Sequence, residues 1–488
     1  MRMHNFLLAM LVATGIGASG CQPKPEGAIK VVVIGGEAKL RDPNLEPLSN
    51  PDTMLLANVA QGLVRFDASG QIEAGLAERW IVSDDGLSYI FRIATTKWSD
   101  GSKVTARQVA RLLQRAVAAN SQNTLKDTLG AVEEIVPMTD RVIEFRLRAP
   151  RPNLLQLLAQ PELAIISNGR GTGPFALSAK RGADGDLRLE RQRAELDGET
   201  DGPEEVWLSA AGTDPAVKAF VAGRVDLILG GTFADLPLAR AQRLPRGALV
   251  FDPVAGLFGL QPLRKDGPLA DPEVRALLSQ AIDRGALVAQ LGVPGLLPRA
   301  TILQGGLEGV PEPVAPAWLN LPIADRRAAL IAESDRLFGV DEKPSLRIAL
   351  PEGAGADLLL RQLQRDWGLL GIKVERASPG QPIDLKFIDA VAPSASPAWF
   401  LRQLRCEVSA ICADAADPLI EAARAAPIAP QRGALLNQAA QIMDEQVLFI
   451  ALTAPIRWSL VSDRVRGFSG NRFARHTLTA LQDTPGRD

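Results

Sequence analysis

The spacing of apolar residues changes along the chain, and each spacing predicts a kind of element. Residues 29–34 are rich in β-branched apolar side chains, which is typical of a strand buried on both faces. Residues 80–92 alternate apolar and polar positions around an Asp-Gly pair, which predicts a hairpin. In residues 105–117 the apolar positions recur three and four residues apart behind Thr105 and Gln108, which predicts an amphipathic helix with a capping box.

The second half of the chain predicts a parallel sheet. One long helix is expected over residues 271–291, with Asp and Pro at its start and Gly292 at its end. Residues 346–350 then predict a strand, 357–370 a helix and 372–376 a second strand. Because a strand–helix–strand unit joins parallel neighbours, this half of the chain belongs to the α/β class.

The most apolar stretch lies at the N-terminus. Residues 6–16 follow a short basic start and are too few to span a bilayer, so they predict a secretory signal, with a buried N-terminal helix as the alternative. The small residues after them end in Ala-Ser-Gly-Cys21, which resembles the lipobox of bacterial lipoproteins. We therefore expect a signal peptide over 1–20, a lipidated Cys21 and a tether over 21–28. The mature protein would lie in the periplasm or cell envelope, anchored to a membrane.

Composition argues for binding rather than catalysis. Lys and Arg number 54 against 56 Asp and Glu, so there is no basic excess for nucleic acid. The chain has two histidines, His4 and His476, and none of the Gly-x-Ser-x-Gly, His-Glu-x-x-His, Ser-x-x-Lys or P-loop motifs. We expect no catalytic residues, no metal and no cofactor, although carboxylate pairs leave a glycosidase open.

Two glycine-containing segments could be taken for anion-binding loops. Gly35-Gly36 follows the first strand but lacks the third glycine and the helix of a dinucleotide fingerprint, so it predicts a strand exit. The segment from Gly171 to Phe175 (Gly-Thr-Gly-Pro-Phe) is interpreted as a turn before a crossover strand.

Cys406 and Cys412 stand six residues apart. The expected compartment permits disulfides, and a zinc site would need two further ligands. We therefore expect a disulfide, with free thiols as the alternative, and it would stabilise the fold by roughly 2 kcal/mol in the chain-entropy model.

Several motifs are spread over nearly the whole mature chain, in residues 61–67, 70–80, 97–106, 171–175, 220–228, 268–275, 281–284 and 457–468. Together they resemble the extracellular solute-binding proteins of ABC importers, in the peptide/nickel-binding group known as family 5. The resemblance implies an α/β Venus flytrap of the type II periplasmic-binding-protein kind, with two α/β lobes and an inserted α+β lobe. The implied boundaries are 29–53, 172–255 and 457–488 for lobe I, 54–171 for the inserted lobe II and 256–456 for lobe III.

The same resemblance implies a function. Such a receptor traps a peptide or similar small polar solute between its lobes and delivers it to an ABC permease in the inner membrane, without chemistry. We expect a monomer. The alternative is a structural or signalling lipoprotein whose cleft is filled by its own side chains, and a secreted hydrolase would need a carboxylate pair in the cleft.

Peptide binders of this family usually carry an aspartate that pairs with the peptide amino group. In the corresponding residues 387–400, Ser394 to Pro397 stand at the acidic position, and Asp389 comes earlier. Because an unpaired buried ammonium is costly, the usual peptide chemistry is in doubt, and hydroxyl or amide groups would suit Ser394 and Ser396 better.

The site itself is nominated from topology. Ligands of α/β sheets bind beyond the carboxyl ends of strands, which nominates residues from three regions. They are Gly36 and Glu37 after the first strand, Phe258 and Gln261 near the lobe crossover, and Ser394, Ser396 and Trp399 in the third lobe. Trp399 could stack on a ligand or pack in a core.

Overall fold

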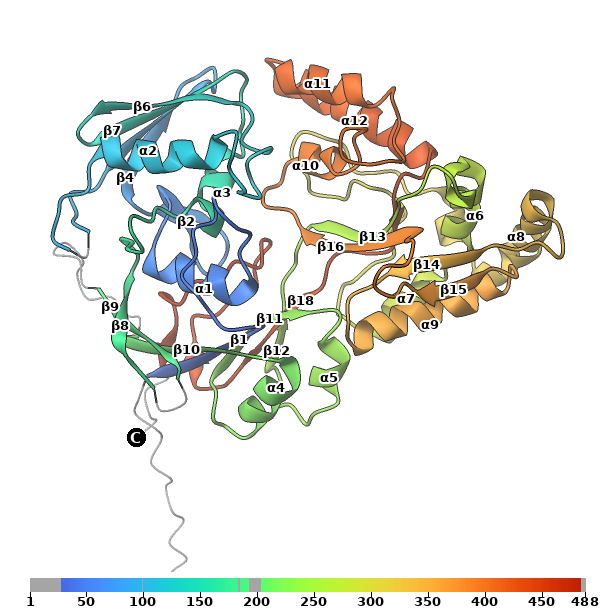
Figure 1. Ribbon diagram of the computed structural model, residues 1–488, viewed down its shortest axis with the longest axis horizontal. Helices are drawn as coiled ribbons and strands as arrows, with labels where there is room; N and C mark the ends of the chain where they lie inside the picture. Colours follow the sequence, from blue (N-terminus) through green and yellow to red (C-terminus); the bar gives the residue numbers. More distant parts are fainter. Residues whose placement is uncertain (1–27, 99, 183–184, 193–202, 484–488) are drawn as a thin grey trace, which may run out of the picture.

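The β-branched run 29–34 forms the centre of a seven-stranded sheet. The computed structural model describes residues 28–98, 100–182, 185–192 and 203–483. Strand β1 (Ile29–Ile34) lies parallel to both of its neighbours, which confirms the predicted strand. The strand order is β12-β18-β11-β1-β10-β9-β8 (Figure 1).

We term this sheet and its helices lobe I. Its other elements are α1 (Asn50–Val59), β8 (Phe175–Arg181), β9 (Leu187–Arg191), β10 (Glu205–Ala211), α4 (Thr213–Val221), β11 (Leu227–Thr232), α5 (Leu236–Arg240), β12 (Leu249–Phe251), β18 (Arg457–Val461), β19 (Val465–Arg466) and β20 (Gln482–Asp483). The predicted signal 1–20 and the lipidated Cys21 lie outside the described residues. Within the described part of the chain, no helix is both long and apolar enough to cross a bilayer.

Lobe II is built on an antiparallel sheet in the order β4-β5-β7-β6. The predicted hairpin is confirmed as β4 paired with β5, and the predicted helix as α2, whose Thr105 and Gln108 form the capping box. The elements of this lobe are β2 (Val64–Phe66), β3 (Ile72–Ala74), β4 (Ala77–Val82), β5 (Ser88–Ile93), α2 (Ala106–Val117), β6 (Val132–Thr139), β7 (Val142–Leu147), α3 (Leu154–Leu158) and the 3₁₀ turn η1 (Pro161–Leu163).

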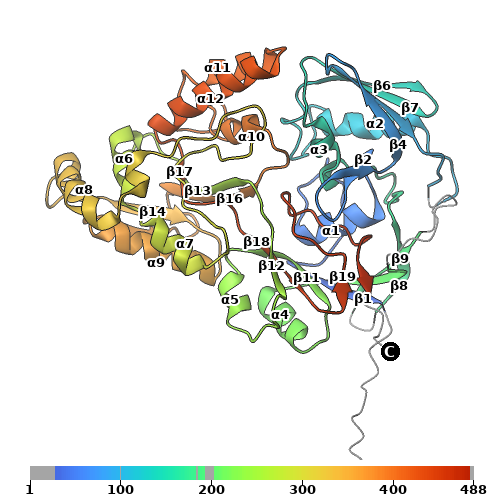
Figure 2. The ribbon, with the colours of Figure 1, turned by 180° about the vertical axis from the view of Figure 1, so that it is seen from behind.

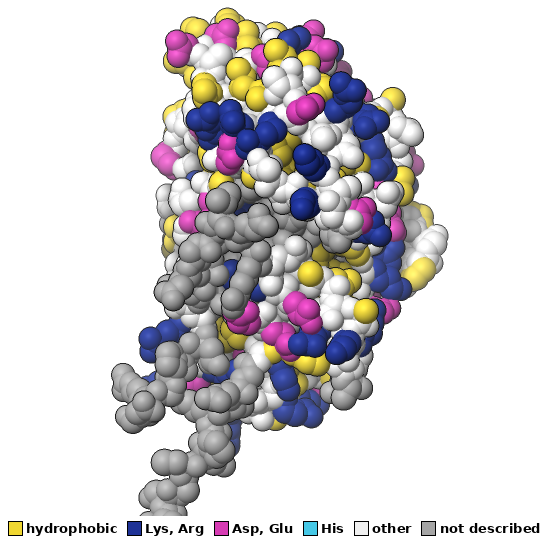
Figure 3. Space-filling view, turned by 90° about the vertical axis from the view of Figure 1, so that its left-hand side faces the viewer, with side chains coloured by type: hydrophobic (Ala, Val, Ile, Leu, Met, Phe, Trp, Pro, Cys, Tyr) yellow, Lys and Arg dark blue, Asp and Glu magenta, His cyan; other side chains and the backbone are white. Residues whose placement is uncertain are grey.

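The described surface carries charges of both signs. On the face of the molecule drawn in Figure 3, cationic and anionic side chains are interspersed, and the whole chain has nearly equal numbers of each, 54 and 56.

Lobe III is built on a five-stranded sheet in the order β15-β14-β16-β13-β17. The predicted strand–helix–strand unit is confirmed as β14, α9 and β15, with the two strands parallel. Its elements are β13 (Gly256–Pro262), η2 (Pro268–Ala270), α6 (Pro272–Ala281), α7 (Arg284–Leu291), η3 (Ala317–Asn320), α8 (Ile323–Phe338), β14 (Ser345–Ala349), α9 (Ala354–Gly368), β15 (Lys373–Arg376), β16 (Leu385–Val391), α10 (Pro397–Arg402), α11 (Asp417–Ala425), α12 (Ala429–Glu445) and β17 (Ile450–Ala451). Three main sheets, of seven, five and four strands, beside two small two-stranded ones in the described chain confirm the predicted α/β fold class, while the lobe boundaries stay predictions.

The predicted single helix over 271–291 is wrong, because the chain breaks it into α6 and α7. Ile282 is extended, and Asp283 caps α7 by accepting a hydrogen bond from the backbone N–H of Ala286 at 2.9 Å. The backbone N–H of Asp283 donates in turn to Asp366 at 2.9 Å. The predicted ends are correct: Asp271 caps α6, and Gly292 ends α7 at a φ of +60°.

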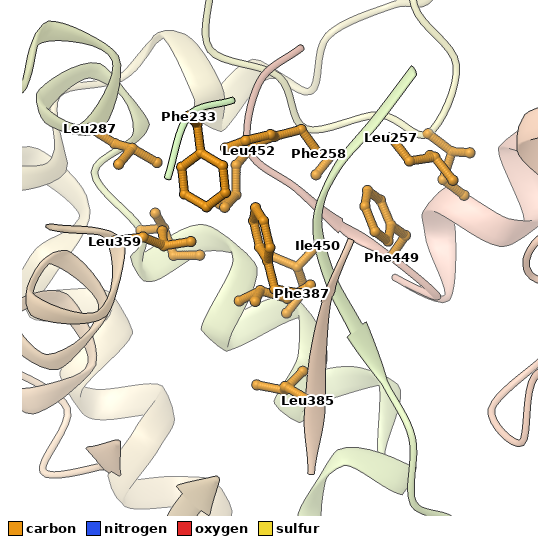
Figure 4. Packing of buried hydrophobic residues seen from close by; sticks show 14 of the residues in the cluster. Phe233, Leu257, Phe258, Leu287, Leu359, Leu385, Phe387, Phe449, Ile450 and Leu452 are labelled. Atoms are coloured by element: carbon orange, nitrogen blue, oxygen red, sulfur yellow. The ribbon is translucent and has the colours of Figure 1, made fainter. Parts of the chain in front are cut away.

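Lobes I and III share one continuous apolar core. At its centre Phe233, which follows β11, meets Phe258 of β13 and Phe387 of β16, with ring centroids 4.9 to 5.0 Å apart (Figure 4). Lobe II has a separate core. The described apolar packing therefore couples lobe I to lobe III more firmly than it couples either to lobe II.

The Gly171–Phe175 segment connects lobe II back to lobe I. It runs so close to the end of α1 that a Cβ at Gly171 would lie 2.3 Å from the carbonyl oxygen of Val59. Strand β8 starts at Phe175, the last residue of this segment, and pairs antiparallel with β9 at the edge of the sheet, so the segment does lead into a strand of lobe I.

The predicted disulfide between Cys406 and Cys412 is present. Asp414 lies beside the two sulfurs, but a thiol engaged in a disulfide is not a thiolate ligand, so the trio is not a metal site in this form.

Replacing both cysteines by alanine should lower the free energy of unfolding by about 2 kcal/mol, because the unfolded chain regains the entropy of the small loop. Urea denaturation followed by circular dichroism measures this. The wild-type protein in excess dithiothreitol should shift to the same midpoint as the variant. Equal midpoints for the oxidised wild type and the variant would contradict the expected stabilisation.

Candidate functional site

A cavity of about 260 Å³ lies where the three lobes meet. Lobe I contributes the ends of β1 and β11 and the start of β18, so the cavity sits beyond the carboxyl ends of two parallel strands. The other walls are α1, β2, the residues 159–161, the end of β16 and the segment 473–477. That last segment returns alongside α1, where the N–H of Leu478 donates to the side-chain oxygen of Asn58 at 3.2 Å (Figure 2).

A tryptophan forms the floor on the lobe I side. Trp458 packs flat against the backbone at Gly231, where a Cβ would lie 2.2 Å from the indole. Its Nε1–H donates to the carbonyl of Thr232 at 2.8 Å. Glycine is therefore required at 231, and the ring is held in one orientation. On the opposite side, Phe66 stacks on Phe473 at a centroid distance of 4.7 Å.

A buried ion pair joins lobe I to lobe III at the cavity. Arg457 of β18 donates through Nη1 to both carboxylate oxygens of Asp389, at 2.8 and 3.0 Å, and through Nη2 to the Asp389 carbonyl at 3.1 Å. Burial raises the pKa of Asp389, while the charge and hydrogen bonds of Arg457 favour its ionised form. The guanidinium of Arg457 therefore lines the cavity, but its positive charge is already neutralised by the carboxylate of Asp389.

A second polar group lies around Asp252. Its Oδ2 lies 3.2 Å from Nε2 of His476, and its Oδ1 accepts the backbone N–H of Asn471 at 2.9 Å. The His476 ring also packs on Phe468. His476 is almost fully buried at the cavity wall, packed between parts of the C-terminal segment.

A third group ties the C-terminal segment to lobe II. Arg475 donates through Nε to Gln160 at 2.9 Å and through Nη2 to Glu162 at 2.8 Å. Arg65 of β2 is likewise paired, with Glu73 at 2.7 Å.

These groups define what the cavity can bind. Among the described lining residues the cations are Arg65, Arg457 and Arg475, and the one carboxylate is Asp252. Because Asp252 is engaged by His476 and Asn471, no lining carboxylate is left to compensate a ligand ammonium. Hydroxyl, amide and carboxylate groups suit the site better than a free amine.

The predicted ligand contacts are divided between several places. Gly36 and Glu37 are exposed after β1, where Glu37 pairs with Lys39. Phe258 is 1% exposed in the core shared by lobes I and III. Gln261 is buried and donates to the hydroxyl of Ser409 at 3.2 Å. None of the four lines the cavity of about 260 Å³.

Ser394, Ser396 and Trp399 come together, but at a different cavity of about 90 Å³ between lobes II and III. The segment that carries them is shared between the two cavities, since Pro393 lines the larger one. As ligand contacts, all seven residues stay a prediction.

The sequence interpretation did not nominate the residues that line the larger cavity. One signal was available: Gly230-Gly231 ends the buried strand β11, so the rule that nominated Gly36 applied equally to it. The segment 473–477 carried no such signal. Contacts between residues distant in the sequence, such as the hydrogen bond of Leu478 to Asn58, bring it to the cavity wall.

Comparison with known proteins agrees with this architecture. The sequence profile of "Bacterial extracellular solute-binding proteins, family 5 Middle" matches residues 71–379. A dipeptide-binding protein of Pseudomonas aeruginosa is 23% identical over 87% of this chain and 89% of its own. The oligopeptide-binding protein OppA of Bacillus subtilis is 26% identical over 47% of this chain, which covers 48% of that relative.

Among solved structures, the Escherichia coli murein tripeptide-binding protein MppA superposes with a TM-score of 0.80, at 18% identity, over 93% of this chain and 98% of that one. At that identity the superposition shows the fold alone. The profile, however, covers well over half of the chain, and the resemblance inferred from its motifs is confirmed. The chain belongs to the bacterial extracellular solute-binding proteins of family 5.

Proposed function

We propose that this protein is the lipid-anchored receptor of an ABC importer and that it captures a peptide or similar small polar solute in the cavity of about 260 Å³. The observation that carries the proposal is the position of that cavity, at the junction of the three lobes and beyond the ends of β1 and β11. The receptor would hand its solute unchanged to a permease in the inner membrane and would act as a monomer.

The cavity also favours a ligand class. Its volume of about 260 Å³ lies just below the range of ligand pockets, about 300–1,000 Å³, which suits a small solute better than a long peptide. All its described charges are already paired, so specificity would rest on hydroxyl, amide or carboxylate groups that meet Arg457 and Arg475. Stacking against Trp458 and Phe66 would supply apolar contact.

A degenerate cleft in a structural or signalling lipoprotein is the competing function. In that case side chains would fill the junction, whereas an open space of about 260 Å³ remains there. This space favours binding.

Filling the cavity should abolish ligand binding. Ala57 of α1 lines it, so Ala57→Trp places an indole in the space that the solute needs. Wild-type protein should show a ligand-dependent rise in melting temperature in a screen of short peptides, N-acylated peptides, opines and sugars, since a ligand that binds only the folded state raises its stability.

The Ala57→Trp variant should lose the ligand-dependent rise in melting temperature. The matched control is Ala332→Trp, which adds the same side chain at an exposed position of α8 and should show the same rise as the wild type. A ligand shift that survives in Ala57→Trp would place the solute elsewhere, and no shift with any member of the screen would favour the competing function.

Lipid anchoring has its own test. Cys21→Ser removes the thiol that the acyl chain requires, so the protein made in its own host should move from the membrane fraction to the soluble envelope fraction. Mass spectrometry of the mature N-terminal peptide should show acylation in the wild type alone. Equal membrane association of both proteins would contradict an anchor at Cys21.

A further inference from the structure

Arginine side chains predominate among the charged residues that line the smaller cavity, of about 90 Å³. It lies between lobe II and the helices α10, α11 and α12 of lobe III, which face α3 in Figure 1. Four half-buried guanidinium groups line it and are termed here the arginine cluster: Arg151, Arg402, Arg424 and Arg432. The one carboxylate among the described lining residues is that of Glu308, which is exposed.

The cluster is not neutralised within the described part of the chain. Of its members only Arg424 has a carboxylate within 4.0 Å, that of Glu421 at 3.7 Å. The cross-lobe bonds of the cluster all go to backbone carbonyls: Arg151 to Arg424, Arg402 to Asp127, Arg424 to Gly130 and Arg432 to Pro150, at 2.7 to 3.1 Å. Carbonyls orient a guanidinium but carry no net charge to offset it.

Burial and, after it, mutual repulsion act on the cluster. Burial and, after it, the charges of Arg402, Arg432 and Arg424 lower the pKa of Arg151 to about 10. Burial and the charge of Arg424 also lower the pKa of Arg402, and the charges of Glu421 and Asp127 offset this only in part. Arginine is so basic that these groups stay charged at neutral pH, so the cavity keeps its positive charge.

Two further features point into the same space. Ser394 is 1% exposed, lines the cavity, and its hydroxyl has no hydrogen-bond partner. A buried hydroxyl without a partner is uncommon and indicates a missing acceptor. Helix α12, 17 residues long, begins at Ala429 on the cavity wall, where the positive end of its dipole favours an anion.

We propose that this cavity binds one small oxyanion, such as phosphate, sulfate or a small free carboxylate. Planar guanidinium groups match such oxyanions in geometry as well as charge, and the hydroxyl of Ser394 gains its acceptor. The volume of about 90 Å³ admits a small ion, separate from the solute of the larger cavity.

The ion would also act on the lobes. Arg151 of the cluster belongs to lobe II and its other members belong to lobe III. A bound anion therefore attracts both lobes and stabilises the conformation in which lobes II and III are in contact. This role goes beyond solute capture, because the ion is not the solute.

Isothermal titration of the mature protein with sodium phosphate tests the site, in a buffer free of oxyanions and with chloride at equal ionic strength as the reference. Sulfate and acetate are titrated in the same way. One saturable site per chain is expected for at least one of these ions.

Ser394→Ala is the most direct variant, because it removes a hydroxyl that makes no hydrogen bond in the protein. It should weaken the binding of that ion by about threefold to tenfold without lowering the melting temperature of the ion-free protein. Arg402→Gln should weaken binding by about tenfold or more. Arg361→Gln, at an exposed position of α9, is the matched control and should bind as the wild type does.

Ala57→Trp separates this site from the solute cavity, and it should leave ion binding unchanged. The inference is overturned by the absence of saturable binding above chloride, or by equal binding in Ser394→Ala, Arg402→Gln and Arg361→Gln. Loss of ion binding in Ala57→Trp would place the ion in the larger cavity. Binding of glycerol phosphate but not of inorganic phosphate would mean that the oxyanion belongs to a larger solute, which also overturns it.

Discussion

The buried pair of Arg457 and Asp389 is the interaction on which the cavity of about 260 Å³ depends. It joins β18 of lobe I to β16 of lobe III, and both side chains are less than a fifth exposed. Separating such a pair would leave a buried charge without compensation, at a cost of about 3–5 kcal/mol. The pair therefore fixes where the end of β16 lies relative to Trp458. It also occupies the carboxylate of Asp389, so this carboxylate is not free to pair with a ligand ammonium. One contact thus sets both the shape of the cavity and the ligand chemistry that it favours.

The three lobes are joined by contacts of different kinds, and this difference indicates where the molecule can open. Lobes I and III share a core that includes Phe233, Phe258 and Phe387. Lobes II and III have separate apolar cores and are bridged by hydrogen bonds, such as those from the N–H of Ala395 to the side-chain oxygen of Gln156 and from the side-chain amide of Gln160 to the carbonyl of Pro393. Water can replace such bonds with a small net loss, whereas exposing aromatic core is expensive. Opening between lobes II and III is the less costly motion.

What could be predicted from the sequence was set by the range of the interactions. Strand β1, the hairpin of β4 and β5 and the capped helix α2 follow from residues close together in the chain, and all three were correct. The break between α6 and α7 was missed because Asp366, 83 residues away, holds the N–H of Asp283. Most walls of the larger cavity were missed for the same reason, although Gly230-Gly231 at the end of β11 offered a local signal for one of them. Residues as distant as Asn58 and Leu478, or Gln160 and Arg475, bring its walls together, and no local pattern encodes those pairs.

The segment from Pro393 to Ser396 gives the two cavities a physical link. Pro393 lines the larger one, and Ser394 and Ser396 line the smaller one. Gln156 and Gln160 of lobe II hold this segment through hydrogen bonds to its backbone, at the N–H of Ala395 and the carbonyl of Pro393. If each cavity binds a ligand and both ligands favour the same position of the segment, each must raise the affinity of the other by the same factor. An anion between lobes II and III would then strengthen solute capture, and opening of the lobes would release both ligands together.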